Sequence, residues 1–97
     1  MEIKVGQYYA HEYTESDGST EVNIIKIIPN KLHTLDAFAR AETLYVKDGQ
    51  VRNMYTTDWV KDSIKRKATE SEIQLFNKKR EKMIDLKSYG ELVSPKF

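Results

Sequence analysis

Aromatic and apolar side chains alternate with polar ones at the beginning of the chain, as they do in extended backbone. Val5, Tyr9 and Tyr13 fall on one side of a pleated strand that runs from Val5 to Tyr13. Tyrosine is also enriched in strands, so we predict the first strand over this segment. The pair Asp17-Gly18 follows it, and because these residues tolerate a positive φ, the pair predicts a tight hairpin turn.

β-Branched residues dominate the next segment, from Thr20 to Ile28. Branching at Cβ restricts χ1 in a helix, so this composition favours a second strand. Ile24 and Ile25 are adjacent and break strict alternation, which predicts either a strand covered on both faces or a strand with a β-bulge. Pro29 ends the strand, because proline cannot donate a hydrogen bond to the sheet. This segment is the best candidate for the hydrophobic core.

The segment from Leu32 to Val46 fits two periodicities, because its apolar residues recur at helical spacing and also alternate as in a strand. We favour a long strand. The reason is a second Asp-Gly pair, Asp48-Gly49, which lies between two apolar segments and predicts another hairpin. The chain that enters this turn must already be extended near Leu44. The choice between strand and helix stays open for Leu32 to Ala41.

A short helical turn and a longer helix are predicted in the last third of the chain. Thr57 to Ile64 places apolar side chains at helical spacing behind Asp58, which could cap a single turn. A brief extended segment, Lys65 to Lys67, is expected next. Thr69 and Glu72 then have the spacing of a capping box, in which the Thr hydroxyl accepts the amide of the Glu and the Glu carboxylate reaches back.

The helix behind this box is predicted to run to about Lys87. Its apolar residues recur at intervals of three, seven and three, and the aliphatic stem of an arginine fills the gap, giving the stripe Ile73, Phe76, Arg80, Met83 and Leu86. Glutamates in the first turn and lysines nearer the end suit the helix dipole. Ser88-Tyr89-Gly90 is expected to end the helix and to leave a short tail.

Together these elements predict an α+β fold in a single domain over residues 1–97. Four or five strands joined by tight turns fit a small, strongly bent antiparallel sheet or a partly open SH3-like barrel, with the C-terminal helix closing one side. We expect the β-rich part over residues 5–68, the C-terminal helix over 69–87 and the tail over 88–97. A length of 97 residues allows one hydrophobic core.

Two stretches resemble a known group of proteins. Ile3-Lys4-Val5-Gly6-Gln7-Tyr8-Tyr9 resembles the opening of many small SH3-like barrels, where a glycine precedes the first strand. The run from Ala68 to Phe76 resembles the start of the helix that follows such barrels in small proteins of phages and other mobile elements. The resemblance implies an accessory protein that binds a host macromolecule and alters its activity. It implies no particular functional residues.

The composition excludes several kinds of chemistry. The chain contains no cysteine, which excludes disulfides, thiolate metal sites and a cysteine nucleophile. Its two histidines, His11 and His33, lie in no metal-binding or catalytic spacing, and its four glycines are dispersed rather than gathered in a phosphate-binding loop. We therefore predict that the protein is not an enzyme and has no cofactor or bound metal.

The beginning of the chain lacks the apolar run of a secretory signal, and nowhere do 18 apolar residues follow one another. We therefore predict a soluble, cytoplasmic protein without a membrane partner. If a phage encodes the chain, the compartment is the cytoplasm of the host cell.

Basic residues gather in the C-terminal third, although the net charge of the chain is only +1. The first 60 residues carry a net charge of −3, and residues 61–97 carry a net charge of +4. Strand tyrosines could stack on bases while seven basic residues contact the phosphate backbone. These seven residues are Lys61, Lys65, Arg66, Lys67, Lys78, Lys79 and Arg80. Nucleic-acid binding is the alternative function. A solvated helix face would account for the same charges.

Aromatic residues exceed what a small core needs, which favours a protein-binding role. Tyrosine and tryptophan bury much area with few rotors, so they are frequent interface anchors. The candidates are Tyr8, Tyr45, Tyr55 and Trp59, although Trp59 could equally belong to the core. We predict a non-enzymatic binding module, and the partner that we expect it to bind and modulate is a host protein. Homodimerisation through a sheet edge or the helix would account for the same surplus.

Overall fold

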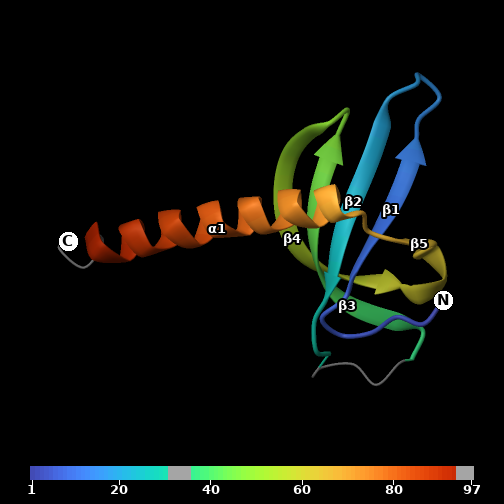
Figure 1. Ribbon diagram of the computed structural model, residues 1–97, viewed down its shortest axis with the longest axis horizontal. Helices are drawn as coiled ribbons and strands as arrows, with labels where there is room; N and C mark the ends of the chain where they lie inside the picture. Colours follow the sequence, from blue (N-terminus) through green and yellow to red (C-terminus); the bar gives the residue numbers. More distant parts are fainter. Residues whose placement is uncertain (31–35, 94–97) are drawn as a thin grey trace.

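The computed structural model describes residues 1–30 and 36–93, with side chains described up to residue 82. It is an α+β fold with one antiparallel sheet of five strands, which is not closed, and one C-terminal helix (Figure 1). The order across the sheet is β4-β3-β2-β1-β5. Its strands are β1 (Tyr8–Thr14), β2 (Thr20–Ile27), β3 (Phe38–Lys47), β4 (Gln50–Val60) and β5 (Arg66–Lys67), and the helices are the 3₁₀ turn η1 (Lys61–Ser63) and α1 (Glu70–Val93). The predicted fold class is confirmed at this level.

Both predicted hairpins are confirmed. Gly18 has a φ of 87° in the turn between β1 and β2, where the amide of Glu15 donates to the carbonyl of Ser19 at 2.8 Å. In the turn between β3 and β4, Asp48 and Gly49 have φ values of 50° and 78°. Two successive positive φ angles are typical of the tight turn whose twist matches that of the flanking strands.

Strand β2 is covered on both faces, which was one of the two expectations for its adjacent isoleucines. Ile24 and Ile25 are 1% and 0% exposed although they point to opposite faces. The face that carries Ile25 is called the inner face, and its buried cluster is Tyr9, Ile25, Ile27, Ala39, Ala41 and Ile64. The face that carries Ile24 is called the outer face, and its buried cluster is Ile24, Leu44, Val46 and Phe76.

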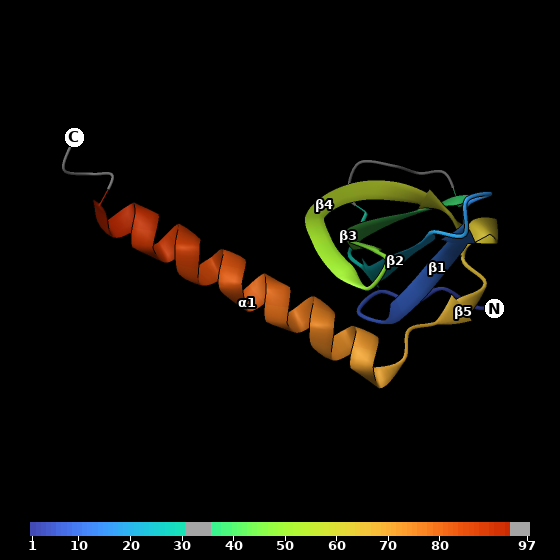
Figure 2. The same ribbon diagram turned by 90° about the horizontal axis from the view of Figure 1, so that it is seen from above.

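The sheet curls toward its inner face. Trp59 on β4 and His11 on β1 both lie on this face, and their ring centroids are 5.4 Å apart. In a flat sheet, β1 and β4 would be about 14 Å apart, because neighbouring strands are spaced by about 4.8 Å. The contact therefore requires a strong bend, and Figure 2 shows β4 curving around the other strands. The predicted strong bend is confirmed.

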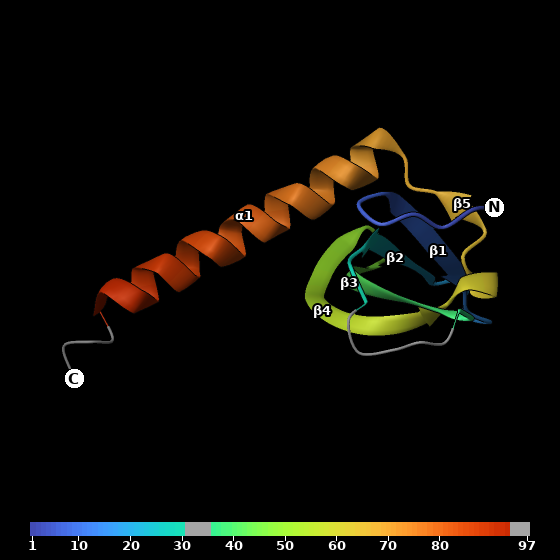
Figure 3. The ribbon, with the colours of Figure 1, turned by 90° about the horizontal axis from the view of Figure 1, so that it is seen from below.

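Helix α1 covers the outer face with its first turns only. Phe76 is fully buried against the outer cluster, and its ring meets that of Tyr8 edge-on at a centroid distance of 5.5 Å. One turn further on, Arg80 Nη1 donates to Glu42 Oε1 of β3 at 2.7 Å. Beyond this point the helix extends away from the sheet (Figures 2 and 3). The side chains of Met83 and Leu86, which the predicted stripe included, lie outside the described residues.

Several boundaries differ from the predictions. The first strand begins at Tyr8 rather than Val5, because Gly6 turns the chain with a φ of 85° just before it. Phe38 to Val46 is a strand as favoured, whereas residues 31–35 of the open segment lie outside the described part of the chain. The helix runs through Gly90 to Val93, so its predicted end near Lys87 and the tail from residue 88 were wrong.

The helical turn predicted within Thr57 to Ile64 is present, but it starts later than expected and Asp58 does not cap it. Thr57 to Val60 continues β4, and the 3₁₀ turn begins only at Lys61, without a side-chain cap. Pairing with β3 outweighs the local helical spacing, because Asp58 lies opposite Arg40 and forms an ion pair with it at 3.2 Å. The brief extended segment is confirmed at β5, which pairs with β1.

Candidate functional site

Three of the four aromatic candidates lie on one face of the sheet. Tyr45 and Tyr55 occupy adjacent strands on the inner face, and Trp59 lies further along β4 on the same face. Tyr13 of β1 joins them, because it pairs with Glu21, which shares the face of Ile25. We call Tyr13, Tyr45 and Tyr55, with their neighbours Glu21 and Asn23, the tyrosine face. Tyr8 lies on the outer face instead.

Tyr45, Tyr55 and Trp59 each donate a hydrogen bond to a strand nearer the middle of the sheet. Tyr45 donates its hydroxyl to Glu21 Oε1 at 2.7 Å, one strand away. Tyr55 reaches across β3 to Asn23 Oδ1 at 3.4 Å. Trp59 donates its indole N–H to Thr43 Oγ1 at 2.9 Å. Because Tyr45, Tyr55 and Trp59 are each held by a hydrogen bond, these three rings are ordered before any partner binds.

The two tyrosine hydroxyls resist ionisation for different reasons. The hydrogen bond to Glu21 raises the pKa of Tyr45, and the negative charges of Glu21 and Glu15 add to the effect. The pKa of Tyr55 is raised by its burial. Both side chains therefore stay neutral hydrogen-bonding groups throughout the physiological pH range.

Exposure separates the surface tyrosines from those that hold the fold together. Tyr13 is 55% exposed and Tyr55 is 39% exposed, whereas Tyr9 is buried in the inner cluster. Tyr13 was not among the predicted protein-binding residues. The alternation at the beginning of the chain had placed Tyr13 on the same side of the first strand as Tyr9, and the register of the hairpin confirms this.

Two of the predicted protein-binding residues have structural roles. Tyr8 packs on Phe76, donates its hydroxyl to Asn77 Oδ1 at 3.0 Å and lies beneath the ammonium of Lys26. It therefore fixes α1 to the sheet. Trp59 is partly buried and packs against the inner cluster, which agrees with the alternative that it belongs to the core.

The first group of predicted basic residues lines three separate hollows of the surface. Lys61 lines one with Phe38 and Arg40, Lys65 lines one with His11 and Ser63, and Lys67 lines one with Met1 and Glu2. No one hollow therefore gathers these three lysines.

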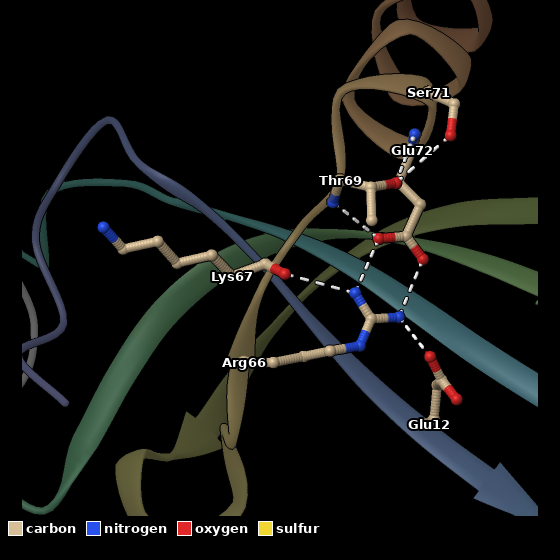
Figure 4. Close-up of polar contacts among 6 residues, drawn as sticks. All are labelled: Glu12, Arg66, Lys67, Thr69, Ser71 and Glu72. Carbon is tan, nitrogen blue, oxygen red and sulfur yellow. Dashed lines mark hydrogen bonds and ion pairs between the residues drawn. The ribbon is translucent and has the colours of Figure 1, made fainter.

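Arg66 is bound by two carboxylates, as Figure 4 shows. Its Nη1 and Nη2 donate to the two oxygens of Glu72 at 2.7 and 2.9 Å, and Nη2 also forms an ion pair with Glu12 of β1. These bonds raise the pKa of Arg66 above its ordinary value. Arg80 is likewise paired, with Glu42. The five lysines of the predicted set form no ion pair with a described residue, and two of them, Lys78 and Lys79, are adjacent on α1.

The described residues contain no group of three or more histidine, aspartate or glutamate side chains that could hold a metal ion. In the same part of the chain, no helix is both long enough and apolar enough to cross a membrane. Nδ1 of His11 is buried and forms no hydrogen bond, while its ring packs against Trp59.

Comparison with known proteins found no matching family model, no matching curated protein and no matching solved structure.

Proposed function

We propose that the protein is a non-enzymatic binding module that recognises a protein partner through the tyrosine face. The observation that carries this proposal is the arrangement of Tyr13, Tyr45 and Tyr55 on one side of a bent sheet, two of them more than a third exposed. Tyrosine contributes large contact area at a low cost in side-chain entropy. The bonds of Tyr45 and Tyr55 to Glu21 and Asn23 lower that cost further.

Nucleic-acid binding has weaker support from the same structure. Lys61, Lys65 and Lys67 line three separate hollows of the surface, and both arginines of the predicted set are held in ion pairs. Phosphate binding gains affinity from many cations acting together, because each neutralised phosphate releases counterions. The tyrosine face itself carries the carboxylate of Glu21, which would repel a phosphate backbone.

A more specific proposal concerns the fold and the partner. The bent five-stranded sheet and the two short sequence resemblances support a partly open SH3-like barrel that a phage or mobile element encodes. In that setting the partner is a host protein whose activity changes when the tyrosine face covers part of it, and the protein acts in the host cytoplasm.

The test is affinity capture from a nuclease-treated bacterial lysate with tagged wild-type protein and two double variants. In the first variant, Tyr13→Ala and Tyr55→Ala remove exposed rings from the tyrosine face. In the second, Lys65→Ala and Lys67→Ala remove the same number of exposed side chains from the region of β5, outside the tyrosine face. Circular dichroism and thermal unfolding of each variant establish that the fold is kept.

The proposal expects one discrete protein that the wild type and the lysine variant retain at raised salt and that the tyrosine variant loses. Retention by the tyrosine variant would contradict it. If the lysine variant alone lost its partner, or if nuclease abolished capture, nucleic-acid binding would take its place. Recovery of a second copy of this chain as the retained protein would instead show homodimerisation.

A further inference from the structure

A second surface lies on the other side of the sheet, between α1 and the beginning of β4. It is a shallow groove of about 330 Å³, which is at the lower end of the range for ligand pockets. Two partly buried apolar side chains and three lysines line it: Val51, Leu75, Lys78, Lys79 and Lys82. We call it the lysine groove.

Helix geometry places four of these residues in one stripe. Leu75, Lys78, Lys79 and Lys82 follow the spacing i, i+3, i+4 and i+7, so they lie along the same side of α1. Phe76 and Arg80 lie on the neighbouring stripe and make the contacts that hold the helix on the sheet. Of the stripe, Leu75 packs against the outer cluster, whereas the three lysines take no part in these attaching contacts.

The charges of the groove are not balanced within the described part of the chain. Arg66 and Arg80 each have a carboxylate partner, whereas none of the three lysines forms an ion pair with a described residue. Lys78 and Lys82 are also one turn apart, an arrangement in which like charges destabilise a helix. An anionic ligand in the groove would relieve this repulsion.

The floor of the groove is apolar, so a ligand that fills the groove should also carry an apolar group. Val51 and Leu75 pack against the outer cluster yet keep part of their surface open toward the lysines. Together the charges and the floor favour a ligand that has carboxylates around an apolar side chain. We propose that the lysine groove binds an acidic segment of a protein partner, with one apolar residue on Val51 and Leu75. This inference goes beyond the tyrosine face, which lies on the opposite side of the sheet.

A protein segment suits this groove better than a nucleic acid does. Lys78 and Lys82 are separated by about 6 Å along the helix axis, because each residue advances the helix by 1.5 Å, so the stripe reaches few phosphates. Nucleic-acid affinity depends on the number of phosphates that are neutralised. The apolar floor also gives a sugar-phosphate backbone no favourable contact, whereas it accepts an aliphatic or aromatic side chain.

The test measures fluorescence anisotropy with three labelled probes and the full chain. The first probe is a short peptide of glutamates around one central phenylalanine. The second replaces the phenylalanine with serine, and the third is a short single-stranded oligonucleotide of mixed sequence. Wild-type protein is compared with the triple variant K78A/K79A/K82A and with the matched control K61A/K65A/K67A, which removes three lysines outside the groove.

The phenylalanine peptide is expected to bind the wild type and the control variant equally, and to bind the groove variant about tenfold more weakly. The serine peptide is expected to bind the wild type more weakly than the phenylalanine peptide does, and raised salt to weaken binding of both. The double variant Y13A/Y55A is expected to bind like the wild type, since its changes lie on the other face.

Three results would overturn the inference. They are the absence of peptide binding to the wild type, equal weakening by the groove and control variants, and equal binding of the two peptides. Tighter binding of the oligonucleotide, lost in the groove variant, would also overturn it and would assign the groove to nucleic acid. Circular dichroism of both triple variants confirms that lost binding does not reflect lost helix.

Discussion

Arg66 and Glu72 form a two-pronged ion pair between β5 and the first turn of α1, with both nitrogen–oxygen distances below 3 Å. The same carboxylate accepts the amide of Thr69 at 2.8 Å, and Thr69 Oγ1 accepts the amide of Glu72 at 3.2 Å. Through Arg66, Glu12 of β1 joins this group. A helix cap that serves one turn in most proteins here also links the helix to the edge of the sheet.

The first prediction concerns the pH dependence of this link. The hydrogen bonds from Arg66 lower the pKa of Glu72 from 4.5 to about 2. Since the folded state holds this carboxylate ionised, its stabilising effect is complete above the ordinary pKa of 4.5 and is lost as pH falls toward 2. We expect Glu72→Gln to lower the free energy of unfolding by about 1 kcal/mol at neutral pH.

Thermal unfolding followed by circular dichroism checks this expectation, and the stability curves of the wild type and Glu72→Gln should converge as pH falls through that window. Glu70→Gln is the matched control, because Glu70 is an exposed carboxylate in the same helical turn. Its effect should stay within about 0.5 kcal/mol. A difference between wild type and Glu72→Gln that did not change with pH would contradict the assigned pKa.

The second prediction concerns the attachment of α1. Phe76 is fully buried against the outer cluster, so Phe76→Ala is expected to lower the free energy of unfolding by about 3 to 5 kcal/mol. Urea unfolding followed by circular dichroism measures the loss. Gln74→Ala, an exposed change two residues away, should alter stability by less than about 0.5 kcal/mol. A cost below about 1 kcal/mol for Phe76→Ala would mean that the helix does not depend on this contact.

The third prediction concerns the hairpin between β3 and β4. Gly49 has a φ of 78°, and a Cβ at this position would have nothing within 4 Å. Gly49→Ala should therefore cost about 1 kcal/mol through backbone strain alone. Gly49→Asn should cost less, because asparagine adopts this conformation more readily. Equal stability of the two variants in urea unfolding would show that the turn does not require a positive φ here.

The fourth prediction concerns Trp59 and Thr43, whose side chains are joined by the indole N–H. Trp59→Phe keeps an aromatic ring in the inner cluster but removes the donor, and we expect it to cost about 1 to 2 kcal/mol. Thr43→Val removes the acceptor from a fully buried position. A double-mutant cycle of the two changes should show a coupling of about 1 kcal/mol. Additive effects would mean that this bond contributes nothing to stability.

The candidate site was only partly predictable from the sequence. Tyr45 and Tyr55 were chosen by residue type, and only strand pairing shows that they share the inner face: Tyr45 of β3 pairs with Asn53 of β4, and Tyr55 lies two residues further along β4. Tyr8 was chosen by its residue type, yet it lies on the opposite face beneath α1. A single-residue difference in register decides between a surface ring and a core ring.

Local signals let the sequence alone determine two turns and the start of α1, and they limited β2 to two alternatives, a strand covered on both faces or a strand with a β-bulge. Each depends on groups a few residues apart, such as Thr69 and Glu72, or on the adjacent pair Ile24 and Ile25. The tertiary structure decided what depends on distant partners. Arg66 meets Glu12, which lies 54 residues away, and Asp58 extends β4 by pairing with Arg40 instead of capping a helix. These choices need the sheet to form first, since only strand pairing and its curl bring such residues within bonding distance.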